Sequence, residues 1–183
     1  VGYGALSTYN ADNGINTAVG KNALYALTTG QENIAIGANA ADEVTTGSSN
    51  VVIGYLAMEA ADGSESKNIA IGRGALRNMD SDGSNYNVAI GYNAGNDITT
   101  GKYNISIGGL SGCSNAAANN LTSDGNISIG YECGEVLEGA AAGNTFIGHQ
   151  AADLVTTGQY NVTVGINAMG AAGVALDESD KNN

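Results

Sequence analysis

The chain contains no proline and no tryptophan, and only one phenylalanine, one histidine, two cysteines and six basic residues among 183. Without proline, no backbone position lacks the N–H group that a hydrogen-bonded ladder needs. With so few large aromatic residues, a core must be thin and built from small and branched aliphatic side chains. These absences favour a slender, ladder-based structure over a globular domain.

The shortage of basic residues also limits the partners. Eighteen acidic residues against six basic ones give a formal net charge of −12. Such a surface repels a phosphate backbone, so we predict that the chain does not bind nucleic acid. Its apolar runs are short compared with the about 20 residues that a membrane-spanning helix requires, so we also predict no membrane span.

What the chain does contain is a repeat. A phrase of an asparagine, three residues ending in Val or Ile, and a glycine recurs at intervals of 17 to 22 residues. Fixed self-similarity of this length indicates a solenoid, in which each unit contacts mainly its neighbours. We predict one elongated repeat domain over residues 1–183 without evident capping repeats, folded as a mainly β, parallel β-solenoid or β-roll of about ten rungs. The whole phrases are Asn16–Gly20, Asn33–Gly37, Asn50–Gly54, Asn68–Gly72, Asn87–Gly91, Asn104–Gly108, Asn126–Gly130, Asn144–Gly148 and Asn161–Gly165.

Each phrase predicts one short strand. Its second and fourth residues, such as Ile34 and Ile36, are mostly β-branched, and alternate residues of a strand share one face. We therefore expect the coils to stack on a shared aliphatic spine. The residue between them, such as Ala35, points the other way. Because that second face is small and uncharged, we expect it to be covered too, by a neighbouring chain, by the rest of the coil or by glycan.

The remainder of each rung shows two further features. A small residue stands three positions after each glycine, often followed by Leu or Met, which predicts a second buried column and a short helical or 3₁₀ turn. A Thr-Thr-Gly sequence precedes four of the phrases, and we expect its glycine to adopt a positive φ. These sequences are Thr28–Gly30, Thr45–Gly47, Thr99–Gly101 and Thr156–Gly158.

The asparagine that opens each phrase is predicted to have a structural role. Stacked asparagine side chains form amide ladders in cross-β structures, and asparagine also bonds its local backbone. The predicted ladder consists of Asn16, Asn33, Asn50, Asn68, Asn87, Asn104, Asn126, Asn144 and Asn161.

The phrases, together with the Ala-Leu and Thr-Thr-Gly pieces, resemble the tandem repeats of long extracellular fibrous proteins, including phage tail fibres and environmental surface fibrils. Phrases such as Asn87–Gly91 are also similar to the head repeats of trimeric autotransporter adhesins of the YadA type, whose heads are β-rolls. The resemblance implies an extracellular, cell-surface or virion-surface structural protein. Two functions stay open: a filament subunit, or the shaft or head of an adhesin or tail fibre that binds host glycans.

The two ends of the sequence suggest how a filament would grow. Val1 and Gly2 read as the back of a phrase, and Asn182 and Asn183 read as the front of one. Complementary, non-closing contacts generate open filaments, so we expect copies of the chain to polymerise end to end through these residues.

The remaining candidates are few. Cys113 and Cys133 lie about one rung apart, so either an intrachain disulfide or two small buried residues fits. His149 is the single histidine, and no serine or cysteine nucleophile is paired with it and a second base. We therefore interpret it as a solvated surface residue and predict that the chain is not an enzyme. Tyrosines after corner glycines, Tyr3, Tyr55, Tyr92 and Tyr131, either stack on sugars or, as we favour, pack beside neighbouring rungs.

Metal and glycan sites are equally sparse. Asp62–Ser64 and Asp82–Ser84 lack the dense acidic spacing of a calcium loop, so we predict no cofactor and keep calcium only as a minor alternative to a solvated acidic surface. Glycosylation sequons begin at Asn104, Asn120, Asn126 and Asn161. Three of these residues belong to the predicted ladder, which leaves Asn120 as the candidate for attached glycan.

Overall fold

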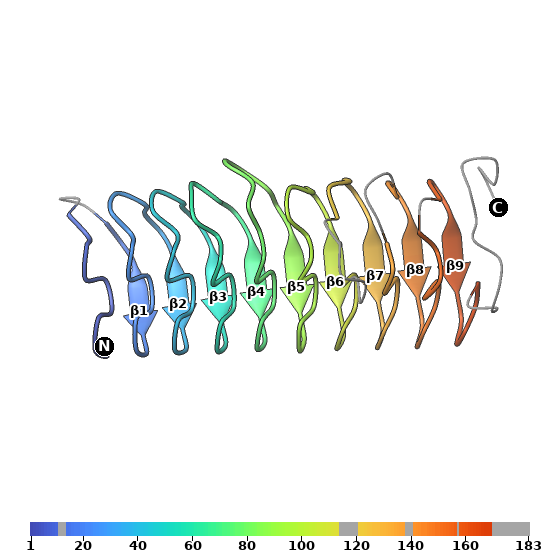
Figure 1. The fold of residues 1–183 in the computed structure, drawn as a ribbon, viewed down its shortest axis with the longest axis horizontal. Coiled ribbons are helices and arrows are strands. Elements are labelled where there is room, and N and C mark those ends of the chain that lie inside the picture. Colours follow the sequence, from blue (N-terminus) through green and yellow to red (C-terminus); the bar gives the residue numbers. More distant parts are fainter. Residues whose placement is uncertain (11–13, 114–120, 138–140, 157, 170–183) are drawn as a thin grey trace.

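In the computed structural model, residues 1–10, 14–113, 121–137, 141–156 and 158–169 are described. Over these residues the chain winds into a parallel β-solenoid with one three-residue strand per rung and no helix. The strands lie side by side along the longest axis and point the same way (Figure 1). The fold predicted from the repeat is confirmed. The strands are β1 (Thr17–Val19), β2 (Ile34–Ile36), β3 (Val51–Ile53), β4 (Ile69–Ile71), β5 (Val88–Ile90), β6 (Ile105–Ile107), β7 (Ile127–Ile129), β8 (Thr145–Ile147) and β9 (Val162–Val164).

Every strand pairs in parallel with the next one along the chain, at the same position of the phrase. Ile34 lies opposite Val51, and Val51 lies opposite Ile69. Ahead of β1, the first residues form a strandless coil that stacks on the first rung: the N–H groups of Gly20 and Asn22 donate to the carbonyls of Val1 and Tyr3, each at 2.8 Å. The predicted alignment of the columns is therefore confirmed over nine strands and one additional coil.

The structure corrects the prediction about which face of the strand is interior. The middle residue of every strand is buried, whereas the β-branched residues on either side are exposed or half-buried. In β2, Ala35 is 0% exposed, while Ile34 and Ile36 are 40% and 39% exposed. The aliphatic spine therefore lies outside the coil, and the face of small residues is the core.

The interior of the coil is narrow because the strand lies against the turn segment of its own rung. The second small column predicted three residues after each corner glycine is buried, and Ala40, Ala57, Ala75 and Ala94 are all 0% exposed. Larger core residues lie seven residues after a corner glycine, at the end of the turn segment, or four residues after one. One more, Phe146, is the middle residue of β8. These larger residues include Leu27, Val44, Met58, Leu76, Met79, Ile98, Leu137 and Phe146.

The turn segment is not helical, contrary to our prediction. The second and fourth residues after a corner glycine take left-handed φ values, as at Asn22 (56°) and Leu24 (52°). Their backbone groups bond between rungs: the N–H of Leu24 donates to the carbonyl of Ala40 at 3.0 Å. A helix would use these groups within one rung, so continuing the ladder excludes it.

The glycines act in two ways, one of which differs from our prediction. Corner glycines such as Gly91 have φ near +140°, and a Cβ there would lie 2.4 Å from the carbonyl oxygen of Gly108 in the next rung. In contrast, Gly47 of a Thr-Thr-Gly loop is not in the positive-φ region; it is needed because a Cβ would lie 2.2 Å from the Glu65 carbonyl oxygen. The left-handed position in that loop is Ser49, with φ of 61°.

Candidate functional site

The asparagine ladder runs the length of the described solenoid. At each of its steps the backbone N–H of one ladder asparagine donates to the side-chain Oδ1 of the asparagine in the preceding rung, at 2.8 to 3.1 Å. The predicted residues are brought into one column, which confirms that the phrases carry an asparagine ladder. Asn16 is half-buried and the other eight are at most 2% exposed.

The side-chain Nδ2 of most ladder asparagines donates to a carbonyl in the loop before the next ladder asparagine. The Nδ2 of Asn33 donates to the Gly47 carbonyl at 2.8 Å, and the Nδ2 of Asn87 donates to the Gly101 carbonyl at the same distance. The side chains of Asn33 and Asn87 therefore each join their own strand to the ladder asparagine of the following rung and to the loop that precedes it. The sequon asparagines Asn104, Asn126 and Asn161 are buried in this column, so their amides are engaged in packing.

The outward columns of β1 to β9 form a continuous apolar surface, which we call the aliphatic face. Its only polar members are two threonines, and it contains no charged residue. Exposed aliphatic patches larger than a few hundred Å² are uncommon on monomeric proteins and mark interaction surfaces. The aliphatic face consists of Thr17, Val19, Ile34, Ile36, Val51, Ile53, Ile69, Ile71, Val88, Ile90, Ile105, Ile107, Ile127, Ile129, Thr145, Ile147, Val162 and Val164.

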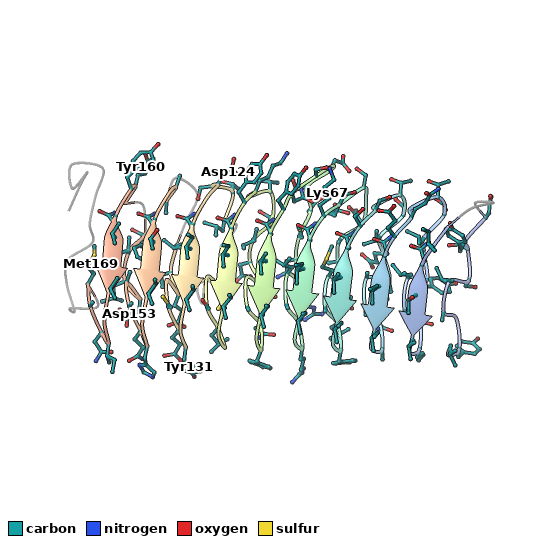
Figure 2. All side chains as sticks on the ribbon, turned by 180° about the vertical axis from the view of Figure 1, so that it is seen from behind. Lys67, Asp124, Tyr131, Asp153, Tyr160 and Met169 are labelled. Atoms are coloured by element: carbon teal, nitrogen blue, oxygen red, sulfur yellow. The ribbon has the colours of Figure 1, made fainter. Side chains whose placement is uncertain are left out.

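Two columns of residues border the aliphatic face, one at each edge: the residue before each ladder asparagine and the residue after each corner glycine, which we call the edge columns. Ten of their 18 residues are aromatic or cationic. Figure 2 shows Lys67 and Tyr160 along the upper edge of the rod and Tyr131 along the lower edge. At the upper edge the rings of Tyr86 and Tyr103 stack with centroids 5.5 Å apart, and the Lys67 ammonium lies 5.0 Å from the Tyr86 centroid. A hydrogen bond of 2.9 Å from Lys67 to the Tyr86 hydroxyl lowers the pKa of Tyr86.

The lower edge fills the gaps between its tyrosines with other planar side chains. The Arg73 guanidinium lies between the rings of Tyr55 and Tyr92, 5.8 and 5.7 Å from their centroids. His149 stacks on Tyr131 with ring centroids 5.5 Å apart. Tyr55, Tyr92 and Tyr131 therefore pack against side chains of neighbouring rungs, as we favoured from the sequence.

An acidic cluster lies in the loops of the fourth and fifth rungs. Carboxylate oxygens of Asp62, Glu65 and Asp80 lie within 4.8 Å of one another. Glu65 is buried, and burial raises the pKa of its carboxyl, while its oxygens accept hydrogen bonds from the N–H groups of Gly63 and Ser81 at 3.0 and 3.3 Å. The Glu65 side chain therefore serves as a hydrogen-bond acceptor for the backbone of two loops. Calcium takes six or more oxygens, and the prediction that the chain has no cofactor stays a prediction, with calcium as its minor alternative.

Cys113 and Cys133 are both buried free thiols in the structure. Cys133 occupies the small column three residues after a corner glycine, as its place in the repeat indicated, and Cys113 donates through Sγ to the Leu110 carbonyl at 3.0 Å. Burial raises the pKa of Cys113 to about 12 and of Cys133 to about 11. Neither thiol is therefore an activated nucleophile.

The remaining predicted residues divide into two groups. Val1, Gly2 and Tyr3 lie in the coil that stacks on the first rung, and Val1 and Tyr3 are highly exposed. Asn120, Asn182 and Asn183 lie outside the described residues.

Two features were missed by reasoning from the sequence. One is that the aliphatic face is exposed; the other is the contact of Arg73 with two tyrosines. The second had a signal, because the residues after the corner glycines read Tyr55, Arg73 and Tyr92 in consecutive rungs. Reading that column for planar side chains instead of tyrosine alone would have found the stack.

Comparisons of the chain with protein-family models, with curated proteins and with solved structures find no match. Among the described residues, no helix is long and apolar enough to span a membrane.

Proposed function

We propose that the chain is a structural subunit of an extracellular filament, a rod built from stacked rungs. The observation that carries this proposal is the unbroken register: all nine strands pair with their neighbours at the same three positions of the phrase, and one asparagine ladder connects every rung. Length in such a structure increases with the number of rungs, which suits a spacer or a fibre.

The buried end of the ladder supports continued stacking. Asn161 is fully buried, and its Oδ1 accepts no hydrogen bond from the described residues. In every earlier rung this atom accepts the N–H of the next ladder asparagine. A buried acceptor without a donor is unfavourable, and one more rung of the same kind would supply the donor.

Negative-stain electron microscopy over a concentration series tests the filament. We expect fibres whose subunit repeat along the rod axis is about 48 Å, the length of ten coils at about 4.8 Å each. Single dispersed rods at every concentration would contradict the proposal.

Intact-mass measurement of protein from its natural source tests for attached glycan, which adds mass to the bare polypeptide.

The second candidate is the shaft or head of an adhesin or tail fibre that binds surface glycans. The stacked rings of Tyr86 and Tyr103, 44% and 58% exposed, favour it because sugars bind to exposed aromatic faces. A glycan array tests it with a matched pair of variants: Tyr103→Ala should abolish binding, and Tyr25→Ala, outside the edge columns, should not. A wild-type protein that binds no glycan would exclude this function for the segment.

A further inference from the structure

The aliphatic face is an exposed apolar surface that runs along the described rod, and the asparagine ladder does not cover it. From its composition, size and spacing, we infer that it is a lateral interface on which a second copy of this chain packs face to face. This inference goes beyond the proposed function, which concerns stacking along the rod axis.

The distribution of charge supports a partner of the same kind. The aliphatic face and its two edge columns contain one of the 18 acidic residues, Glu32, together with Lys21, Lys67 and Arg73. Six of the nine tyrosines also lie in the edge columns. Depletion of acidic residues with enrichment of tyrosine and arginine is typical of protein interfaces. Two copies that meet on this side would keep nearly all of their acidic residues away from the contact, despite a charge of −12 each. The edge columns are Ile15, Glu32, Ser49, Lys67, Tyr86, Tyr103, Gly125, Gly143 and Tyr160 on one side, and Lys21, Ala38, Tyr55, Arg73, Tyr92, Gly109, Tyr131, His149 and Ile166 on the other.

The area matches what a stable pair requires. Nine strands spaced about 4.8 Å apart, and a width of five residues from the ladder asparagine to the corner glycine, give a footprint of roughly 43 by 16 Å, or about 700 Å², to which the edge columns add. Stable complexes bury about 800 Å² on each partner. The aliphatic face with its edges therefore approaches the area of a standard interface.

The spacing of the side chains selects the occupant. β-branched side chains repeat at the rung spacing along both columns, and the strands keep nearly one direction from end to end (Figure 1). Flat sheets of this kind are stabilised by stacking or by side-chain ladders, and the asparagine ladder already provides the second, so the flat face is available for a second sheet to stack on. Only a partner with the same rung spacing keeps its side chains interdigitated along the whole length, and a second copy has that spacing by construction.

Sedimentation velocity between about 1 and 100 µM tests the inference with two matched variants. Ile90→Lys places a cation at the centre of the aliphatic face, and Leu154→Lys places one elsewhere on the surface; both wild-type side chains are 37% exposed. We expect laterally associated wild-type protein and Leu154→Lys protein. Ile90→Lys should weaken association by about 100-fold or more, because each copy brings one lysine into an apolar contact.

Circular dichroism of both variants verifies that they fold, and Ile90→Thr, which keeps a β-branched side chain, provides a milder version of the same change. Wild-type protein that forms no lateral pairs of rods throughout the series, or lateral pairs that Ile90→Lys leaves intact, would overturn the inference. Its failure is distinguishable from failure of the filament proposal, because end-to-end fibres of Ile90→Lys protein would still appear in the microscope, one rod wide.

Discussion

At the scale of single residues, the rung depends on backbone conformations that few side chains tolerate. Each corner glycine combines a φ that L-residues rarely adopt with close contact to the next rung. From Asn33 onward, the residue before each ladder asparagine is also left-handed, even where it is tyrosine or lysine, as at Tyr103 and Lys67. Such conformations persist only where the surrounding hydrogen bonds determine them.

Gly91→Ala should therefore lower the free energy of unfolding by roughly 3 kcal/mol, from backbone strain and from the contact with the Gly108 carbonyl. Urea denaturation of purified protein measures the change. Gly109→Ala is the control: its φ is not in the left-handed region, and its Cβ would meet only the exposed Tyr131 ring, at 3.3 Å. We expect that change to cost about 0.5 kcal/mol or less. Equal losses in the two variants would show that the corner is not special.

Asn87→Ala should be comparably destabilising for a different reason. The substitution leaves the Asn104 N–H and the Gly101 carbonyl without their partners in a buried column. Unpaired buried groups of this kind cost about 3 kcal/mol together. The control is Asn78→Ala, an exposed asparagine with long hydrogen bonds to Asn96 and Asp97. If the two asparagines prove equally dispensable in thermal unfolding, the ladder does not stabilise the fold.

At the scale of the element, the strand was predictable and the turn was not. Strand positions, register and the asparagine column follow from the phrase itself, because each strand repeats the same alternation around a fixed glycine. The turn residues, for example Asn22–Leu27, have good helix propensity, which made a helical turn the natural prediction. Propensity does not count the hydrogen bonds that neighbouring rungs offer, and those bonds determine the turn.

Asp42, in the turn segment after Gly37, makes the stability of the fold sensitive to pH. Burial, followed by the nearby charges of Glu59 and Glu43, raises the pKa of Asp42 from 3.8 to about 6. The folded state thus holds the proton more tightly than the unfolded state, so the stability contributed by protonated Asp42 is lost as pH rises between these two values. Above pH 6 the buried carboxylate penalises the fold.

Asp42→Asn should therefore stabilise the protein at neutral pH, by about 1 kcal/mol after allowance for solvent screening. The gain should disappear as the pH is lowered to 3.8, where wild-type Asp42 is already protonated in the folded state. Denaturation of both proteins across this pH range measures the difference. A gain that does not change with pH would rule out titration of Asp42 as its cause.

The two thiols of the turn segments should react slowly in the native protein. Because burial suppresses the thiolate of Cys113 and Cys133, we expect iodoacetamide to label both about 100-fold more slowly in native than in urea-unfolded protein. Timed labelling followed by intact-mass measurement provides the rates. Rapid native labelling would contradict the burial, and unfolded protein that takes up no label without reductant would reveal a disulfide.

At the scale of the whole molecule, the stack of coils was predicted correctly, but the β-branched columns were wrongly expected to form its interior. Columns of isoleucine usually mark a core, yet the interior between strand and turn segment accommodates Ala35 and Ala40, both fully buried, and not two facing isoleucines. Only the width of the coil decides this, and width depends on a turn geometry that residue types do not reveal. The consequence is a rod whose core is small and whose apolar residues remain for lateral contact.

The stack also predicts that rungs are interchangeable. Deleting residues 37–53 joins Ile36 to Gly54, and both Gly37 and Gly54 occupy the same corner with φ near +140°. β2 would then pair with β4 at the same positions at which it pairs with β3. Since each rung contacts only its neighbours, we expect a cooperatively folded rod about 5 Å shorter, as measured by small-angle X-ray scattering. Deleting residues 38–46, about half a rung, leaves too little chain to complete a coil and should prevent folding. A solenoid in which the whole-rung deletion is as disruptive as the half-rung deletion would not be a stack of equivalent units.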